Sequence, residues 1–336
     1  MFNHLLRRYA SDLDNTMRRV VDEVDSAAPG FRTMVRYPLG WSDENGLPYT
    51  GQTGKRVRPL FMLLCAEAAG GDWRQALPAA AAVELLHNFS LVHDDIQDAS
   101  PLRHGRPTVW QVWGVARAIN AGDALFSLAF VALENLSREG VAPETVIQIW
   151  RVFNQTNLEL TRGQHLDMLY ETLDQVTVDE YLSMVLGKSA ALLAACAQIG
   201  ALVATGDEAL AGIYREFALN LGLAFQIRDD ILGIWGDPSV TGKSAATDIS
   251  ARKKSLPVLY GLARSPQLAR LYKQDTLSDT TEAVSLLDLA GARDYALQIE
   301  NDYYTRAVTA LKLAEPQGEA AEWLAQFVDA LFQRSY

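Results

Sequence analysis

The period of the apolar residues is the feature that most constrains the fold of this 336-residue chain. Between Leu125 and Leu136 they recur at three- and four-residue spacings, and sustained two-residue alternation is scarce throughout the sequence. Several segments, including Ala76–Leu86, Ala190–Ala204 and Phe217–Ile227, are apolar on every side, as helices inside a bundle are. The sequence therefore predicts an all-α fold built around a helical bundle.

Turn-forming residues divide the chain into these segments, but none of the breaks has the composition of an interdomain linker. We therefore expect residues 1–336 to form a single domain, in which residues 1–50 make an N-terminal helix and a surface loop. The loop, Pro38 to Gly54, is expected to run over the surface between that helix and the body. No internal repeat or low-complexity tract is present.

The composition excludes several classes of protein. A net charge of −11 disfavours nucleic-acid binding, which needs a basic face, but it allows an anionic ligand held through metal ions. The two cysteines, Cys65 and Cys196, lie in apolar stretches and are expected to be buried thiols. No secretory signal is visible at the N-terminus, and Ala190–Ala204 is too short to cross a bilayer. We expect a cytoplasmic protein with no membrane span.

The first acidic cluster ends a long apolar stretch, where Asp94, Asp95 and Asp98 follow the residues from Ala79 to Val92. On a helix Asp94 and Asp98 lie one turn apart on the same face, where like charges repel. A hard cation such as Mg²⁺ would offset that repulsion. Carboxylates at a solvated helix end would give the same pattern.

The second acidic cluster, Asp229 and Asp230, also follows an apolar helix. Basic residues accompany both clusters, namely Lys55, Arg56, Arg58 and Arg103 near the first and Lys243, Lys253 and Lys254 near the second. Two carboxylate clusters with interleaved cations predict a site for Mg²⁺ and a diphosphate.

The order of these motifs resembles that of the trans-prenyl diphosphate synthases, the family that contains farnesyl and geranylgeranyl diphosphate synthases. The resemblance runs from about Gly54 to Tyr260. It includes the basic segment, both acidic clusters and three further motifs, which are Arg103–Thr108, Gly163-Gln164 with Asp167, and Gly187-Lys188-Ser189. It implies a helical bundle of the isoprenoid synthase type with a central active-site cavity, and a homodimer.

The resemblance also implies a role for each matched residue. The Mg²⁺ ions, three per site, would be ligated by Asp94, Asp98 and Asp229, with Asp95 and Asp230 as further candidates. The allylic diphosphate would be held by Arg103, Lys188 and Lys243, with Ser189 and Gln226 as further contacts. Isopentenyl diphosphate would be bound by Lys55, Arg58, His87 and His104. The implied catalytic groups are Asp94, Asp98, Asp229, Arg103 and Lys188.

The reaction implied is elongation of an allylic diphosphate by isopentenyl diphosphate, in which Mg²⁺ and basic residues stabilise the departing diphosphate. It needs no covalent nucleophile, and the sequence offers none. Phe89 and Ser90 lie five and four residues before Asp94, about one helical turn away. An aromatic residue followed by a small one at these positions resembles the pair found in family members that form a geranylgeranyl product.

The chain departs from the family pattern at two positions. His104 replaces a second arginine, and an imidazole cannot replace a bidentate guanidinium, so acceptor binding is expected to be weaker or pH-sensitive. Gly233 replaces the last aspartate of the second cluster. His87 could instead be a buried histidine bonded to a backbone carbonyl.

Three alternative functions stay open. The first is a farnesyl or longer-chain synthase, and the second is a terpene cyclase or lyase that ionises a single prenyl diphosphate. The third is a non-catalytic subunit of a heteromeric synthase. Retention of Lys55 and Arg58 argues against the cyclase, and retention of both acidic clusters argues against the non-catalytic subunit.

Overall fold

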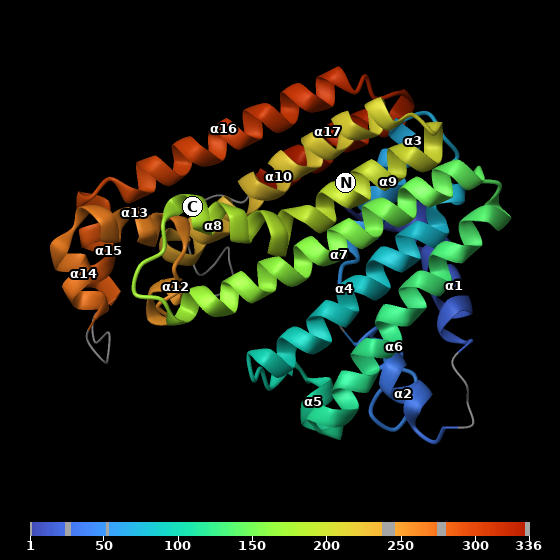
Figure 1. The fold of residues 1–336 in the computed structure, drawn as a ribbon, viewed down its shortest axis with the longest axis horizontal. Helices are drawn as coiled ribbons and strands as arrows, with labels where there is room; N and C mark the ends of the chain where they lie inside the picture. The colour runs from blue at the N-terminus through green and yellow to red at the C-terminus, as the bar shows by residue number, and fades with distance from the viewer. Residues whose placement is uncertain (1, 24–27, 52–53, 237–245, 274–279, 333–336) are drawn as a thin grey trace. The chain divides into compact units, whose positions relative to one another are not determined.

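The computed structural model describes residues 2–23, 28–51, 54–236, 246–273 and 280–332, and it is built almost entirely from helices (Figure 1). The all-α fold expected from the apolar period is thereby confirmed. The chain divides into two compact units. We call Phe2–Trp150 with Ile199–Asp207 the N-terminal unit, and Arg151–Gln198 with Glu208–Tyr336 the C-terminal unit. The single domain stays a prediction.

The N-terminal unit contains helices and one short hairpin. Its helices are α1 (Phe2–Val21), α2 (Phe31–Arg36), α3 (Val57–Ala68), η1 (Trp73–Ala76), α4 (Leu77–Gln97), α5 (Val109–Trp113), α6 (Val115–Glu134) and η2 (Asn135–Glu139). The hairpin strands are β1 (Leu102–Arg103) and β2 (Arg106–Pro107). Two further helices, α7 (Pro143–Thr172) and α9 (Ala191–Thr205), have residues in both units.

The C-terminal unit is helical wherever the structure assigns it regular structure. Its elements are α8 (Val178–Val185), the π-helical turn η3 (Leu186–Ala190), α10 (Glu208–Trp235), α12 (Thr247–Ser250), α13 (Leu256–Arg264), α14 (Pro266–Tyr272), α15 (Thr280–Leu289), α16 (Ala292–Leu313) and α17 (Gly318–Phe332). The helices α10 and α16 run side by side along this unit (Figure 1).

The core of the N-terminal unit lies between α4 and α6, which run side by side (Figure 1). The alanine-rich first half of α4, Ala79 to Ala82, is fully buried, because small side chains allow neighbouring helices to approach closely. On α6, Ala121, Leu125 and Ala129 are also fully buried. This face of α6 is therefore buried within the N-terminal unit.

The segment from Pro38 to Gly54, expected to run over the surface, is anchored at its start. Leu39, Trp41 and Ser42 are buried, and so is Tyr37 just before them. Residues 44–48 are exposed, and so are the described residues 50, 51 and 54. The segment folds back on itself, where the Tyr49 N–H donates to the Trp41 carbonyl over 3.2 Å. Buried aromatic anchors, which a turn-rich composition does not reveal, therefore hold one end of a surface loop.

Two described helical stretches are long and apolar enough to cross a membrane by length and composition, Val115–Glu139 and Val178–Thr205. The apolar window of the second is 72% buried, and Ala190, Ala194 and Ala197 within it are nearly inaccessible. Core packing therefore accounts for the second stretch, as expected from the sequence. The window of the first is 39% buried, which leaves apolar residues such as Val115 and Ile119 exposed.

Candidate active site

A basic pocket of about 200 Å³ opens in the N-terminal unit. Its lining brings together five of the residues expected to act around isopentenyl diphosphate and the first acidic cluster, which are Lys55, Arg58, His87, Arg103 and His104. Arg56 and Arg106 add positive charge, whereas Glu84 and Asp95 are the acidic residues of the wall. The excess of basic groups suits a ligand with several negative charges.

His87 lies at the floor of this pocket and interacts with Arg58. Arg58 Nη1 lies 3.2 Å from His87 Nε2, so the guanidinium donates and the imidazole nitrogen accepts. Burial, followed by the charge of Arg58, holds the pKa of His87 well below its ordinary value. A neutral imidazole that accepts from Arg58 fixes the direction of that guanidinium. His87 is therefore bonded to a pocket residue and not to a backbone carbonyl.

The hairpin β1–β2 contributes Arg103 and His104 to another part of the pocket wall. Its two-residue turn has positive φ at His104 and Gly105, 51° and 76°, as a type I′ turn requires. Glycine and histidine both tolerate this conformation better than β-branched residues do. His104 thus stands at the tip of a tight turn, where the backbone determines its place on the pocket wall.

The first acidic cluster is divided by the helix on which it lies. Asp94 is half-buried and Asp98 is exposed at the C-terminal end of α4, where the Asp98 N–H donates to the Asp94 carbonyl over 2.8 Å. Asp95 is buried and accepts from Arg103 through an ion pair of 2.7 Å. Burial raises the pKa of Asp95, and Arg103 opposes the rise. Asp95 therefore holds Arg103.

The second acidic cluster is divided in the same way. Asp229 is half-buried, whereas Asp230 is 0% exposed. The Asp230 carboxylate accepts from the Tyr181 hydroxyl, from Gln226 Nε2 at 3.2 Å, from Lys253 Nζ at 3.3 Å and from the Leu256 N–H at 3.2 Å. Both oxygens of the Asp230 carboxylate therefore already accept hydrogen bonds from protein groups. We therefore assign Asp230 a role in holding its neighbours.

Asp248 occupies the space next to Gly233. A Cβ atom added at Gly233 would lie 2.6 Å from Asp248 Cγ, closer than such atoms approach. The departure at position 233 thus makes room for a carboxylate from α12. Lys253 Nζ lies 3.4 Å from Asp248 Oδ2, and it therefore bridges the carboxylates of Asp248 and Asp230. The sequence pattern of the second acidic cluster did not identify Asp248.

Lys188 and Ser189 lie on the π-helical turn η3, a distortion that is frequent at functional sites. The turn passes so close to α7 that a Cβ atom at Gly163 would lie 2.2 Å from the Lys188 backbone nitrogen. This approach brings Lys188 into an ion pair with Asp167. The glycines of the two intermediate motifs are therefore needed because two backbones meet there.

Gln226 connects Ser189 to the second acidic cluster. The Ser189 hydroxyl donates to Gln226 Oε1 over 3.0 Å, and Gln226 Nε2 donates to Asp230.

The remaining basic residues differ in their surroundings. Lys254 donates to the backbone carbonyls of Tyr170 and Leu173 at the end of α7, so it stabilises a helix terminus and not a diphosphate. Lys243 lies outside the described residues.

Phe89 and Ser90 lie on α4, before the first acidic cluster. The Phe89 ring contacts Phe126 of α6 with centroids 4.9 Å apart, and Phe126 in turn contacts Phe130 at 5.1 Å. Trp150 continues the row at 5.6 Å from Phe130. Sequence reasoning identified only the first aromatic of this row, because the others come from helices far along the chain.

Within the described residues, no group of three or more His, Cys, Asp or Glu side chains lies together as a ready metal site. Mg²⁺ is usually bound through one or two carboxylates, with substrate phosphates and water completing its six ligands. Asp94 and Asp98, one turn apart at the end of α4, fit that requirement in the presence of a diphosphate. Hard oxygen donors also exclude the softer metals that prefer Cys or His.

Comparison with known proteins decides the family. The model of the polyprenyl synthetase family matches residues 41–287, well over half of the chain. The chain belongs to the polyprenyl synthetase family. It is therefore a prenyltransferase that elongates prenyl diphosphates, which confirms the family and the enzyme class expected from the motifs.

Relatives within the polyprenyl synthetase family carry two product names. The chain is 41% identical to a geranylgeranyl diphosphate synthase of Mycobacterium tuberculosis, over 91% of this chain and 88% of that protein. It is 39% identical to a (2E,6E)-farnesyl diphosphate synthase of the same organism, over 91% of this chain and 86% of that protein. The crystal structure of polyprenyl synthetase from Streptomyces coelicolor is 36% identical, with a TM-score of 0.88 over 98% of this chain and 99% of that one.

Proposed function

We propose that this polyprenyl synthetase condenses isopentenyl diphosphate with an allylic diphosphate and releases a product of geranylgeranyl length. The observation that carries the proposal is the basic pocket, which Lys55, Arg58, His87 and Arg103 line together with Asp95 of the first acidic cluster. His87 lies about two helical turns before Asp94 on α4. Such a pocket can hold the diphosphate of the acceptor next to the carboxylates that serve the allylic substrate.

In the proposed reaction the C–O bond between the allylic carbon and its diphosphate breaks, and the diphosphate leaves with the electron pair. The C=C bond of isopentenyl diphosphate attacks the resulting cation and forms the new C–C bond. A proton is then lost to the released diphosphate, which restores a C=C bond and balances the charge. By the family resemblance Asp94, Asp98 and Asp229 would hold the Mg²⁺ ions, proposed to be three per site, which would supply positive charge to stabilise the leaving diphosphate.

The basic residues of the chain divide the two substrates between them. Lys55 and Arg58 hold the diphosphate of isopentenyl diphosphate, with His87 orienting Arg58 and His104 on another part of the pocket wall. Arg103, fixed by Asp95, and Lys188, fixed by Asp167, hold the allylic diphosphate together with Lys243. Ser189, on the same turn as Lys188, donates to Gln226 of α10, and both are proposed as further contacts of this diphosphate. The cations stabilise the charge that develops on the leaving group.

Product length is proposed to depend on the aromatic row that starts at Phe89. Its ring is packed against Phe126, so its position is held by a neighbouring helix. Ser90 donates to the His87 carbonyl over 2.8 Å. A large ring at position 89 would stop the growing chain, and the geranylgeranyl length is the proposal. Farnesyl and longer products are the alternatives.

We also propose that the enzyme is a cytoplasmic homodimer without a membrane span. Val115 and Ile119, one turn apart on α6, are exposed apolar residues and support an interface outside the buried face of that helix.

The test is incubation of the purified protein with Mg²⁺, labelled isopentenyl diphosphate and each of dimethylallyl, geranyl and farnesyl diphosphate. The products are sized after dephosphorylation, and a geranylgeraniol band is expected. Longer alcohols would contradict only the product length. Release of diphosphate from an allylic substrate alone would instead favour a cyclase or lyase, and no turnover at all would favour a non-catalytic subunit.

A further inference from the structure

An ion-pair cluster outside the pocket links helix α1 to the basic segment at the start of α3. Asp14 of α1 accepts from Arg56 Nη1 at 2.6 Å, from Arg18 Nε at 2.6 Å and from Trp41 Nε1 at 3.0 Å. Burial raises the pKa of Asp14, but the hydrogen bonds from Arg18 and Arg56 outweigh it and leave the pKa below its ordinary value. The three donors come from three different segments, so Asp14 ties them to one point.

Arg56 lies between the two residues that would bind the acceptor diphosphate, Lys55 and Arg58. Its backbone is left-handed, with φ of 47° and ψ of 41°, a conformation that costs a non-glycine residue free energy. The side chain is turned to Asp14, and only 16% of it is exposed. The ion pair with Asp14 therefore stabilises the backbone turn that separates Lys55 from Arg58.

The other wall of the pocket is held in a similar way by Arg106 of the hairpin. Its guanidinium lies 4.0 Å from the ring of Tyr37 and 3.9 Å from the ring of Tyr49. It donates to the carbonyls of Tyr37 at 3.3 Å and Ser42 at 2.8 Å, and the Tyr37 hydroxyl donates back to the Pro107 carbonyl at 2.7 Å. The cation of Arg106 is thus engaged by residues 37–49.

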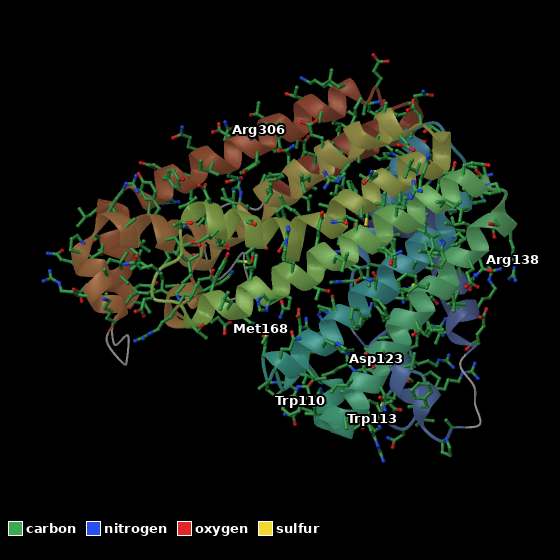
Figure 2. The ribbon with its side chains drawn as sticks, viewed as in Figure 1. Trp110, Trp113, Asp123, Arg138, Met168 and Arg306 are labelled. Carbon is green, nitrogen blue, oxygen red and sulfur yellow. The ribbon has the colours of Figure 1, made fainter. Side chains whose placement is uncertain are left out.

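The same segment meets both walls. Trp41 binds Asp14, whereas Tyr37, Ser42 and Tyr49 bind the hairpin that bears Arg103 and His104. Within the segment the Tyr49 N–H donates to the Trp41 carbonyl. This bond holds the residues that contact Asp14 and those that contact the hairpin at a fixed separation. Trp113 of α5, labelled in Figure 2, packs edge-on against Tyr37 at 5.0 Å and supports it from outside.

We propose that residues Tyr37–Tyr49 are a positioning frame that fixes the two basic walls of the acceptor pocket, with Asp14 and Arg106 as its two anchor points. The inference rests on the proposed function for the identity of the ligand, isopentenyl diphosphate. Asp14 touches no substrate and acts through Arg56. Arg106 acts through the segment that it holds, because stacking and carbonyl bonds already orient its guanidinium.

The experiment compares Asp14→Asn and Arg106→Lys with the unchanged enzyme in steady-state kinetics. We expect the KM for isopentenyl diphosphate to rise about tenfold in each, a loss of the size expected when a charged contact is displaced. The kcat and the KM for the allylic substrate should stay within about twofold. Asp12→Asn is the matched control, because Asp12 lies on the exposed face of the same helix.

A pair of variants separates the backbone conformation from the ion pair. Both Arg56→Ala and Arg56→Gly lose the contact with Asp14, but glycine adopts the left-handed conformation without cost. The KM for isopentenyl diphosphate should therefore rise less in Arg56→Gly than in Arg56→Ala. Equal effects would overturn the role of the left-handed turn.

Calorimetric binding of isopentenyl diphosphate, with no allylic substrate present, separates the failure of this inference from that of the proposed function. If the enzyme binds isopentenyl diphosphate but makes no product, the function fails, and tenfold weaker binding by the two variants still supports the frame. If both variants bind and turn over isopentenyl diphosphate as the unchanged enzyme does, the frame is refuted. It is also refuted if kcat falls without any change in KM, or if the unchanged protein binds no isopentenyl diphosphate.

Discussion

The substitution Asp230→Asn separates two roles for the second acidic cluster, ligation of a metal and support of the fold. Asp230 is 0% exposed, and its carboxylate accepts from Tyr181, Gln226, Lys253 and the Leu256 N–H. Burial lowers the pKa of Lys253, but the nearby carboxylates of Asp230 and Asp248 raise it by more. The pKa of Lys253 therefore lies above its ordinary value. Lys253 is therefore charged, and it depends on Asp230 for compensation.

The expected loss of stability follows from the partners of Asp230 to which an asparagine side chain cannot bond. Removing one partner of a buried ion pair costs about 3–5 kcal/mol, and the lower end applies because 44% of the Lys253 side chain is exposed. Asparagine also places an NH₂ group where at least one donor now points. We expect the free energy of unfolding to fall by about 3 kcal/mol, which lowers the Tm by about 4 °C in a chain of this size.

The assay is thermal unfolding by circular dichroism, beside the Mg²⁺ dependence of turnover. The matched variant is Asp229→Asn, in the half-buried neighbour, which should leave the Tm almost unchanged and raise the Mg²⁺ concentration needed for activity. The reasoning is refuted if Asp230→Asn keeps the Tm of the unchanged enzyme while its Mg²⁺ requirement rises, because Asp230 would then be a ligand.

Three further predictions test other parts of the structure. Gly163→Ala should destabilise the protein by about 2 kcal/mol, because the new Cβ would lie 2.2 Å from the Lys188 backbone nitrogen, whereas Gly212→Ala, with open space at its Cβ, should be neutral or stabilising in the same denaturant titration. Phe89→Ala should shift products toward longer chains in the sizing assay, and an unchanged product would remove Phe89 from length control. His87 has a lowered pKa, so the unfolded chain takes up a proton that the folded state does not, and stability is lost as pH falls below about 6.5. His87→Gln should therefore lose less Tm than the unchanged enzyme between about pH 7 and about pH 5, and equal losses would contradict this.

The helical class and the order of the motifs were predictable because both are written locally in the chain. A period near 3.6 records which residues face a core, and the strongly apolar stretches before Asp94 and Asp229 mark buried helices that end in carboxylates. The buried state of Cys65 and Cys196 followed from the same local pattern. The family resemblance also depended on residues adjacent in sequence.

The residue pattern alone does not distinguish the two carboxylates of each pair, and only the family resemblance ranked Asp94 and Asp229 ahead of Asp95 and Asp230. Asp94 and Asp95, like Asp229 and Asp230, differ by one position, or about 100° around a helix. These helices are apolar on nearly every side, so no amphipathic pattern tells which of the two faces inward. Tertiary partners decide it, because Arg103 holds Asp95 and a set of donors from other segments holds Asp230.

The remaining features depend on residues far apart in the chain. Asp248 fills the space that Gly233 leaves, Trp41 reaches Asp14 across 27 positions, and Phe126 packs on Phe89 from another helix. Local sequence determines the helices and the residues available on them. Only the tertiary structure decides which side chains meet, since long-range packing, and not periodicity, sets the distances between segments.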